Sequence, residues 1–440
     1  MSSPAGPPVL PRVGRFIRRP AARRIAWGIT DQGLSSATNF ALALLVARSV
    51  DVRSFGMYSI AFASYLVALG VSRSLFTQPY MVRVAALPDT ERRRAAQRAV
   101  IGGAILVGFL SAGAFGIAAS IFEGTTRTTL LAFAVAMPGL LLQDAWRFIF
   151  IGSGRPAAAA LNDLVWAFCQ VGFVAAVIGT GTSGVAMLVL AWGGAASIAA
   201  VVGFVQARLS PDHAGALAWL RRHWDLGGPF LGHFGLTHGT DQVTIYGISA
   251  VAGVAAVGAI QAADVLVRPL NFIAIGTSVA TFPEGVRLRD RSARALRYGM
   301  GAVSGALVLA TLGLGAVLLL LPGPVGEQLL GENWAVARPI LIFILAQRLF
   351  FGASQGPRMG LQILGAAGRA LRTQMVLGPL SLGAMLTGAA VAGPIGAVSA
   401  GAVAMFVAGG AWWWQFLVAA RDYRPGDEMG RPTAVPPSGE

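Results

Sequence analysis

The sequence carries little charge for its length and almost no cysteine. Only 12% of its 440 residues are charged, which is about half of the share usual in soluble domains. The one cysteine, Cys169, excludes internal disulfides and cysteine-ligated metal centres. Lysine is absent, so all 34 basic residues are arginine. A chain so poor in charge and 55% hydrophobic is predicted to be a polytopic membrane protein.

Acidic residues are also scarce. There are 19 against 34 basic ones, which gives a net charge of +15. The arginines fall between apolar runs instead of clustering on a soluble face, so we predict no nucleic-acid partner. The sequence has no GxxxxGK[ST] phosphate loop, no His/Cys/Glu cluster at metal spacing and no nucleophile beside a base. We therefore expect neither an enzyme nor a protein with a cofactor or a metal.

Apolar segments of about 20 residues, the length that spans a bilayer, recur along the chain. They predict an all-α membrane protein of about twelve transmembrane helices. The segments are 25–47, 55–80, 99–122, 129–151, 162–180, 185–206, 229–250, 254–282, 298–321, 336–356, 373–392 and 395–420. The least apolar is 229–250, which carries His233, His238 and Asp241.

The arginines predict the orientation, because cytoplasmic loops retain positive charge. With the N-terminus inside, only Arg48, Arg53, Arg127 and Arg338 fall on the outer side. The inner segments are 12–24, 83–98, 155, 208–222, 287–297, 358–372 and 421–431. The bias predicts an N-in, C-in, multi-pass protein of the cytoplasmic (inner) membrane.

The same boundaries divide the chain into predicted parts. A Pro/Arg-rich cytoplasmic tail (1–24) precedes a first six-helix half (25–206), and a second half (229–420) precedes a disordered cytoplasmic tail (421–440). A cytoplasmic linker (207–228) joins the halves. Within it, PDHAGALAWLRRHWDL (211–226) is compatible with an interfacial helix and, equally, with an ordinary polar linker.

Two stretches of the chain resemble one another. AWRFIFIGSGRP (145–156) and AQRLFFGASQGP (346–357) align without gaps, pairing Arg147 with Arg348 and Ser153 with Ser354. We expect each to end an even-numbered helix. Arg73 and Arg268 likewise lie in the second and eighth predicted helices. Two six-helix halves of equal membrane orientation commonly enclose a central cavity.

These four arginines are costly at membrane depth. Each costs about 2.5–3.5 kcal/mol at the bilayer centre on insertion scales. They are therefore expected to face a wet cavity, to form ion pairs or to reach the interface. Asp144 and Arg147, three residues apart, can pair on one helical face, and so can Asp264 and Arg268, four apart.

Arg73 and Arg348 have no acid within a helical turn, so we predict that both line a cavity. Pro269 should break the helix beside Arg268 and place that position at the cavity as well. Gln78, shortly after Arg73, completes the predicted substrate-binding set of Arg73, Arg147, Arg268, Arg348 and Gln78. Asp31, Asp241 and Asp264 are candidates for coupling to a proton or cation, although Asp31 can equally be a carboxylate hydrogen-bonded to a neighbouring helix.

The stretch DQGLSSATNFALALLVARSVDVRSFGMYSIAF (31–62) resembles the start of a known family. Ser35-Ser36, Asn39-Phe40, Ala47-Arg48 and Phe55-Gly56-Met57-Tyr58 match the first two helices of polysaccharide-transporter-like members of the multidrug/oligosaccharidyl-lipid/polysaccharide (MOP) flippase superfamily. The resemblance implies a V-shaped, MATE-like bundle of two lobes that works by alternating access. It also implies a lipid-linked sugar as substrate, with Arg73 and Arg268 near its pyrophosphate.

The function predicted first is thus a flippase for a polyprenyl-diphosphate-linked oligosaccharide. Its expected partners are this substrate, membrane lipids and polysaccharide polymerase or glycosyltransferase machinery. A multidrug or cation antiporter of the same superfamily remains an alternative, and it would need a dominant acid such as Asp31. A major-facilitator permease is a further alternative, but its Gly-x-x-x-Asp-Arg signature is missing from VRVAALPDTERRRAAQR (82–98).

Overall fold

The computed structural model describes residues 40–85, 87–181 and 184–423, and over these residues every element is helical, as predicted. Eight helices are long and apolar enough to cross a membrane. Two shorter apolar helices, Phe40–Ser49 and Val254–Val267, accompany them. Most of the first predicted segment, 25–47, lies outside the described residues. The number twelve and the N-in, C-in orientation therefore stay predictions.

The helices follow one another with short connections. Their bounds are α2 Val52–Ser72, η2 Arg73–Thr77, α3 Gln78–Arg83, α4 Thr90–Ile121, α5 Gly124–Gly152, α6 Pro156–Gly179, α7 Val185–Ala207, α8 His213–Arg222, α9 Trp224–Phe234, η3 Gly235–Gly239, α10 Thr240–Ala252, α11 Val254–Val267, α12 Pro269–Arg291, α13 Ala293–Leu319, α14 Gly323–Leu330, α15 Asn333–Ile363 and α16 Ala367–Asp422.

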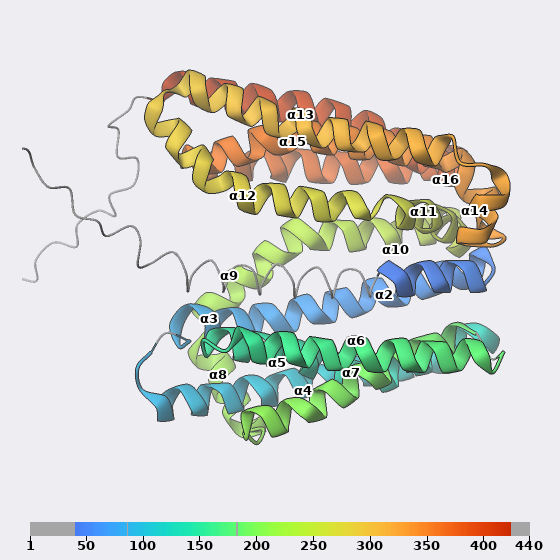
Figure 1. The fold of residues 1–440 in the computed structure, drawn as a ribbon, viewed down its shortest axis with the longest axis vertical. Helices are drawn as coiled ribbons and strands as arrows, with labels where there is room; N and C mark the ends of the chain where they lie inside the picture. Colours follow the sequence, from blue (N-terminus) through green and yellow to red (C-terminus); the bar gives the residue numbers. More distant parts are fainter. Residues whose placement is uncertain (1–39, 86, 182–183, 424–440) are drawn as a thin grey trace, which may run out of the picture.

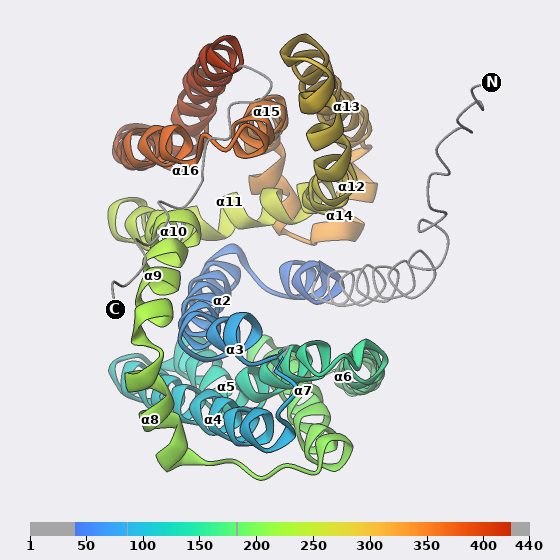
Figure 2. The same ribbon diagram turned by 90° about the vertical axis from the view of Figure 1, so that its left-hand side faces the viewer.

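The helices gather in two bodies that lie side by side. Helices α2 to α7 form one body and α10 to α16 the other, while α8 and α9 connect them at one end (Figures 1 and 2). That end, which we call the basic end, carries Arg83, Arg222 and Arg291 at the ends of α3, α8 and α12. The opposite end, where α14 lies and α15 begins, is called the Asn333 end below.

The linker between the bodies contains a helix, α8, while its placement at the membrane interface stays a prediction. Asp212 caps α8 by accepting a hydrogen bond from the Gly215 backbone N–H (2.8 Å). Within α8, Trp219 is buried, whereas Leu217 is 57% exposed. An apolar residue so exposed beside a membrane bundle fits a helix that lies along the interface.

Two glycines let the bodies touch near the Asn333 end. Gly56 of α2 and Gly258 of α11 lie against each other's helix, and a Cβ on either would overlap a backbone carbonyl oxygen of the other helix. The oxygens concerned belong to Val254 and Val52. Small residues permit such close backbone approach between membrane helices. This crossing fixes how the two bodies meet.

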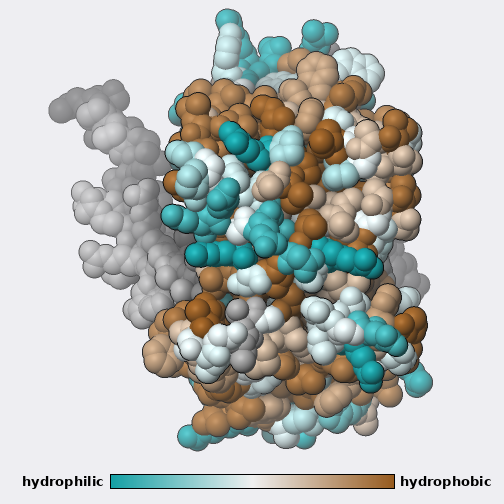
Figure 3. All heavy atoms as spheres, turned by 90° about the vertical axis from the view of Figure 1, so that its right-hand side faces the viewer, coloured by the Kyte–Doolittle hydropathy of each residue, from teal (hydrophilic) through white to brown (hydrophobic). Residues whose placement is uncertain are grey.

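Asn333 adds a polar contact at the same end. Its side-chain amide donates to the carbonyl oxygens of Ala47 (2.5 Å) and Val50 (2.6 Å), at the close of the helix Phe40–Ser49. The last carbonyls of a helix have no partner within it. Asn333 thus satisfies two of them from the other body. Figure 3 views this end, where hydrophilic side chains form a band across the middle of the face.

Helix α15 is longer than the sequence indicated. The predicted end near residue 356 is wrong, because the helix continues through Pro357 to Ile363. Pro357 cannot donate to the carbonyl oxygen of Ala353. Ser304 (2.8 Å) and the indole N–H of Trp413 (2.9 Å) donate to that oxygen instead. The two similar stretches therefore differ, since α5 does end, at Gly152, before Pro156.

Helix α16 is a hairpin of two limbs. Its backbone leaves the helical conformation at Ala392 and Gly393, where the φ of Gly393 is 59°. Next to the turn, Gly388 and Gly396 bring the limbs into backbone contact. From there both limbs run back to the basic end, where α16 closes at Asp422.

Gly258→Leu should separate the bodies at the Asn333 end, because no side chain fits against the Val52 carbonyl. Spin labels at positions 53 and 336, in a Cys169→Ala background, should report a longer distance than in the parent protein. Gly313→Leu is the matched control, since nothing lies within 4 Å of a Cβ at Gly313. An unchanged distance in Gly258→Leu would show that the crossing does not hold the bodies together.

Candidate functional site: two arginine clusters inside the bundle

Each body contains one cluster of partly buried charged and polar side chains. The first cluster consists of Arg73, Asp144, Arg147 and Asp163. The second cluster consists of Asp264, Arg268, Asn271 and Arg348. All four predicted arginines thus belong to one cluster or the other, and every one of them contacts an acid.

Arg73 opens a wide helical turn. The segment Arg73–Thr77 is a π-helix, and the N–H of Gln78 donates to the Arg73 carbonyl five residues back. Pro79 follows directly and cannot continue the regular α-helical ladder, which accounts for the wider turn. Arg73 lies ten residues before Arg83 at the basic end, or about 15 Å along the helix.

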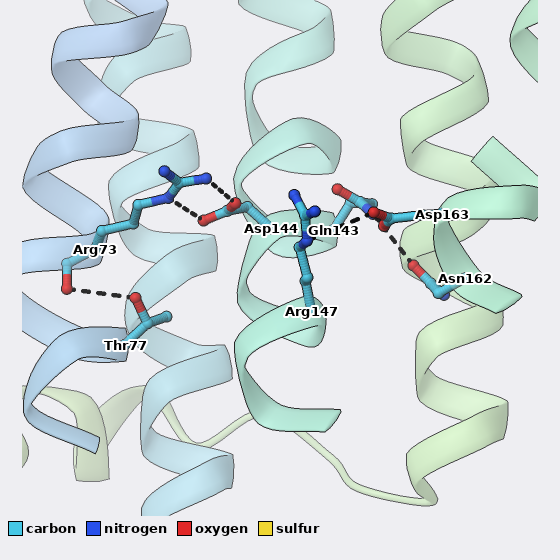
Figure 4. Close-up of polar contacts among 7 residues, drawn as sticks. All are labelled: Arg73, Thr77, Gln143, Asp144, Arg147, Asn162 and Asp163. Atoms are coloured by element: carbon cyan, nitrogen blue, oxygen red, sulfur yellow. Dashed lines mark hydrogen bonds and ion pairs between the residues drawn. The ribbon is translucent and has the colours of Figure 1, made fainter. Parts of the chain in front are cut away.

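Arg73 makes a two-pronged ion pair with Asp144 of α5. Its Nε and Nη2 donate to the two carboxylate oxygens at 2.9 and 2.6 Å, as Figure 4 shows. Its guanidinium also lies 5.3 Å from the ring centre of Phe148. The predicted pairing of Asp144 with Arg147 is therefore wrong. Two parallel hydrogen bonds between the guanidinium of Arg73 and the carboxylate of Asp144 are more stable than a single contact between neighbours on one helix.

Arg147 points to the other side of α5. Its Nε lies 3.5 Å from Asp163 of α6, a carboxylate that is only 2% exposed. Gln143 donates to the same acid at 2.6 Å. Asn162 in turn donates to the Ala199 carbonyl of α7 at 2.8 Å. This polar network joins α5, α6 and α7, and Arg147 lies beside it (Figure 4). Its predicted contact with a substrate stays a prediction.

Asp163 was missed by the sequence reasoning. The signal was present in the adjacent polar pair Asn162-Asp163 at the start of the apolar run 162–180.

The second cluster centres on one carboxylate. Arg348 of α15 donates to Asp264 at 2.5 Å and also to Asn271 at 3.2 Å. Arg268 lies 3.6 Å from the other oxygen of Asp264, which confirms the predicted pairing four residues apart. Arg348 has no acid within a turn of its own helix, as expected, but an acid reaches it from α11, far away in the sequence.

The second cluster keeps one positive charge. Two guanidinium groups face the single carboxylate of Asp264, and no other acid forms an ion pair with them in the described part of the chain. Both arginine side chains remain about one quarter exposed, at 25% and 26%. Arg348 lies midway between Asn333 and Ile363, about 22 Å from either end of α15. An accessible surplus charge therefore sits deep within the bundle.

The predicted break at Pro269 positions Arg268. Helix α11 ends at Val267 and α12 begins at Pro269, so Arg268 occupies the junction. Its own N–H donates to Val265 (3.3 Å), and its carbonyl accepts from Asn271 (2.9 Å). The junction keeps the Arg268 side chain beside Asp264 and Gln261.

The remaining predicted residues are less engaged. Gln78 is half-buried just beyond the π-helix. Asp241 of α10 is exposed and forms no hydrogen bond or ion pair with any described residue. Asp31 lies outside the described residues. A further arginine, Arg358, was assigned from the sequence to an inner loop, but it lies inside α15 between the rings of Trp412 (4.7 Å) and Phe351 (5.4 Å).

Solved structures share this architecture over nearly the whole chain. An inward-facing multidrug resistance MATE family transporter of the MOP superfamily aligns with a TM-score of 0.64 at 15% identity, covering 88% of this chain and 95% of its own. The lipid II flippase MurJ, in an inward closed conformation, aligns at 0.67 with 11% identity and 90% coverage of both chains. The chain shares the fold of these two proteins, which is called the MOP fold below.

A third structure with the MOP fold is a MOP superfamily transporter from Pyrococcus furiosus, for which reverse polarity of the binding pocket suggests a different function. It aligns with a TM-score of 0.53 at 14% identity, covering 91% of this chain and 95% of its own. No family model matches the sequence, and no curated protein matches it. These structural matches establish the fold and confirm the predicted MATE-like bundle. At identities of 11–15% they do not identify a substrate.

Asp144→Asn should destabilise the protein by about 2 kcal/mol, because Arg73 loses its charged partner at membrane depth. Chemical unfolding in detergent measures the change. Asp225→Asn is the control, since it removes the exposed partner of Arg83 and should leave the unfolding free energy nearly unchanged. Equal losses in the two variants would contradict a special role for the Arg73–Asp144 pair.

Proposed function

We propose that this protein is a flippase that moves a polyprenyl-diphosphate-linked oligosaccharide across the cytoplasmic membrane by alternating access. The observation that carries the proposal is the surplus positive charge of the second cluster, where Arg268 and Arg348 share one carboxylate. An anionic head group is the ligand that such a site would attract. The lipid II flippase MurJ has the same fold, which supports a lipid-linked substrate.

The chemistry of the second cluster suits a diphosphate. Guanidinium groups stay charged when partly buried, and they present paired donors to phosphate oxygens. Asp264 holds both arginines in place before any ligand binds, so little ordering cost remains for binding. It also cancels half of their charge, which would keep the attraction weak enough for release. Arg73, 34% exposed in the other body, offers a second contact.

Alternating access would require the contacts at the Asn333 end to separate. Gly56, Gly258 and Asn333 hold the bodies together there without any ionised group. At the basic end, Arg83 donates to both carboxylate oxygens of Asp225 and lowers the pKa of that acid. Asp225 is therefore ionised at neutral pH. Movement of the bodies, rather than protonation of Asp225, would open either end.

Arg268→Ala and Arg348→Ala should each reduce flipping at least about tenfold, the effect of losing one charged hydrogen-bond pair of about 1.4 kcal/mol. Reconstituted vesicles with a fluorescent polyprenyl-diphosphate-linked oligosaccharide measure this as protection from an impermeant quencher. The lysine variants should recover only part of the rate, because an ammonium cannot fork a phosphate. Arg338→Ala, at the Asn333 end, is the control. Full activity of both alanine variants would refute an anionic site.

A multidrug or cation antiporter is the second candidate, and one observation favours it. Asp241 is an exposed acid of α10 with no ion-pair partner among the described residues, a state suited to a proton or a cation. Asp241→Asn should then abolish the exchange of a cationic dye for protons in vesicles. If the proposed flippase function holds, the same variant should flip the lipid-linked substrate at the parent rate.

Cytoplasmic-membrane localisation and contact with polymerase or glycosyltransferase machinery belong to the same proposal. They follow from the substrate class.

A further inference from the structure

A second feature lies away from both clusters, at the basic end of the α16 hairpin. There the two limbs part and leave an open groove of about 1000 Å³, including the space open to the outside. Its lining comes from both limbs and consists of Arg369, Arg372, Thr373, Val376, Leu377, Ala411, Trp414 and Gln415. The limbs lie at the edge of the bundle, so the groove faces the surroundings of the protein (Figure 2).

The mouth of the groove is positively charged. Arg369 donates to Asp422 of the other limb at 2.9 Å, which ties the two limbs together. Arg372, one turn further along, uses only its Nε, which donates to the Gly368 carbonyl at 3.2 Å. Its two terminal nitrogens have no acceptor among the described residues. Two arginines thus face one acid, and Arg372 presents a free pair of donors.

The position of these arginines is unfavourable for the helix itself. Both lie in the first turns of α16, where the helix dipole is positive and disfavours a cation. They therefore do not serve to stabilise this helix end. Together with the dipole they produce a local positive potential that attracts an anion.

Beyond the mouth, the groove becomes apolar. Val376 and Leu377 line it on the first limb, and Val376 is 66% exposed. Leu380, one turn beyond Val376 on the same limb, is 59% exposed and continues this apolar face outside the groove. Trp414, 64% exposed, stands between the charged and the apolar parts. Tryptophan prefers this level of a membrane, where head groups meet acyl chains. The order of arginine, tryptophan and aliphatic surface matches the order of phosphate, glycerol and acyl chain in a phospholipid.

We propose that this groove binds an anionic phospholipid of the leaflet at the basic end. The phosphate lies on Arg372, with Arg369 beside it, and an acyl chain follows Val376 toward Leu380. Basic pockets between membrane helices recognise lipid head groups in this way. The groove lies on α16 and involves none of the residues of the two clusters, so the proposal does not depend on the transported substrate.

Native mass spectrometry of the purified protein tests it, with phosphatidylglycerol and phosphatidylcholine as the probes. The parent protein should retain phosphatidylglycerol in preference. Arg372→Ala should weaken that binding about fivefold, the effect of one basic residue near a charged lipid. This variant leaves the Arg369–Asp422 bridge intact, so it does not loosen the hairpin. Trp414→Ala should weaken the binding of both lipids.

Arg287→Ala is the matched control, because it removes an exposed arginine at the basic end, outside the groove. It should leave phosphatidylglycerol binding unchanged. Equal binding by the Arg372→Ala and Arg287→Ala variants would overturn the proposal. So would loss of bound phosphatidylglycerol to excess inorganic phosphate, which would show a site for free phosphate rather than for a lipid.

Discussion

The ion pairs between Arg and Asp at membrane depth are the interactions on which the rest of this structure depends. An arginine in a bilayer must find a partner or face water. In the first body Arg73 of η2 meets Asp144 of α5, and in the second Arg348 of α15 meets Asp264 of α11. In each body the ion pair joins the helix that carries the arginine to the helix that carries the acid.

The two ion pairs, Arg73–Asp144 and Arg348–Asp264, have their arginine and acid in opposite order along the chain. In the first body the arginine comes from the earlier helix and the acid from the later one, and in the second body the order is reversed. Asp144 corresponds to Leu345 when the two similar stretches are aligned without gaps. The arginines repeat along the chain, but the acids do not. This difference leaves Arg147 with Asp163 as its own acid, while Arg268 and Arg348 must share Asp264. The surplus charge of the second cluster arises from this unequal distribution.

Close backbone contacts complement the ion pairs. The bodies meet where Gly56 and Gly258 remove the side chains between α2 and α11, and the α16 limbs meet at Gly388 and Gly396. Such contacts are short-ranged and carry no charge, so they can separate without exposing an ion. Interfaces of this kind are suited to the alternating access that we propose for this protein.

The sequence by itself determined the helical class, most helix positions and the place of Arg73, Arg147, Arg268 and Arg348 inside the bundle, because low charge and spanning-length apolar runs depend only on local composition. It also indicated the break at Pro269 and the pair Asp264–Arg268, which are four residues apart. Only the tertiary structure decided the partners of Arg73, Arg147 and Arg348, and the course of α15 past Pro357. These depend on side chains such as Asp163 and Ser304 that come from other helices. A contact between helices is set by their packing, which no spacing along one helix records.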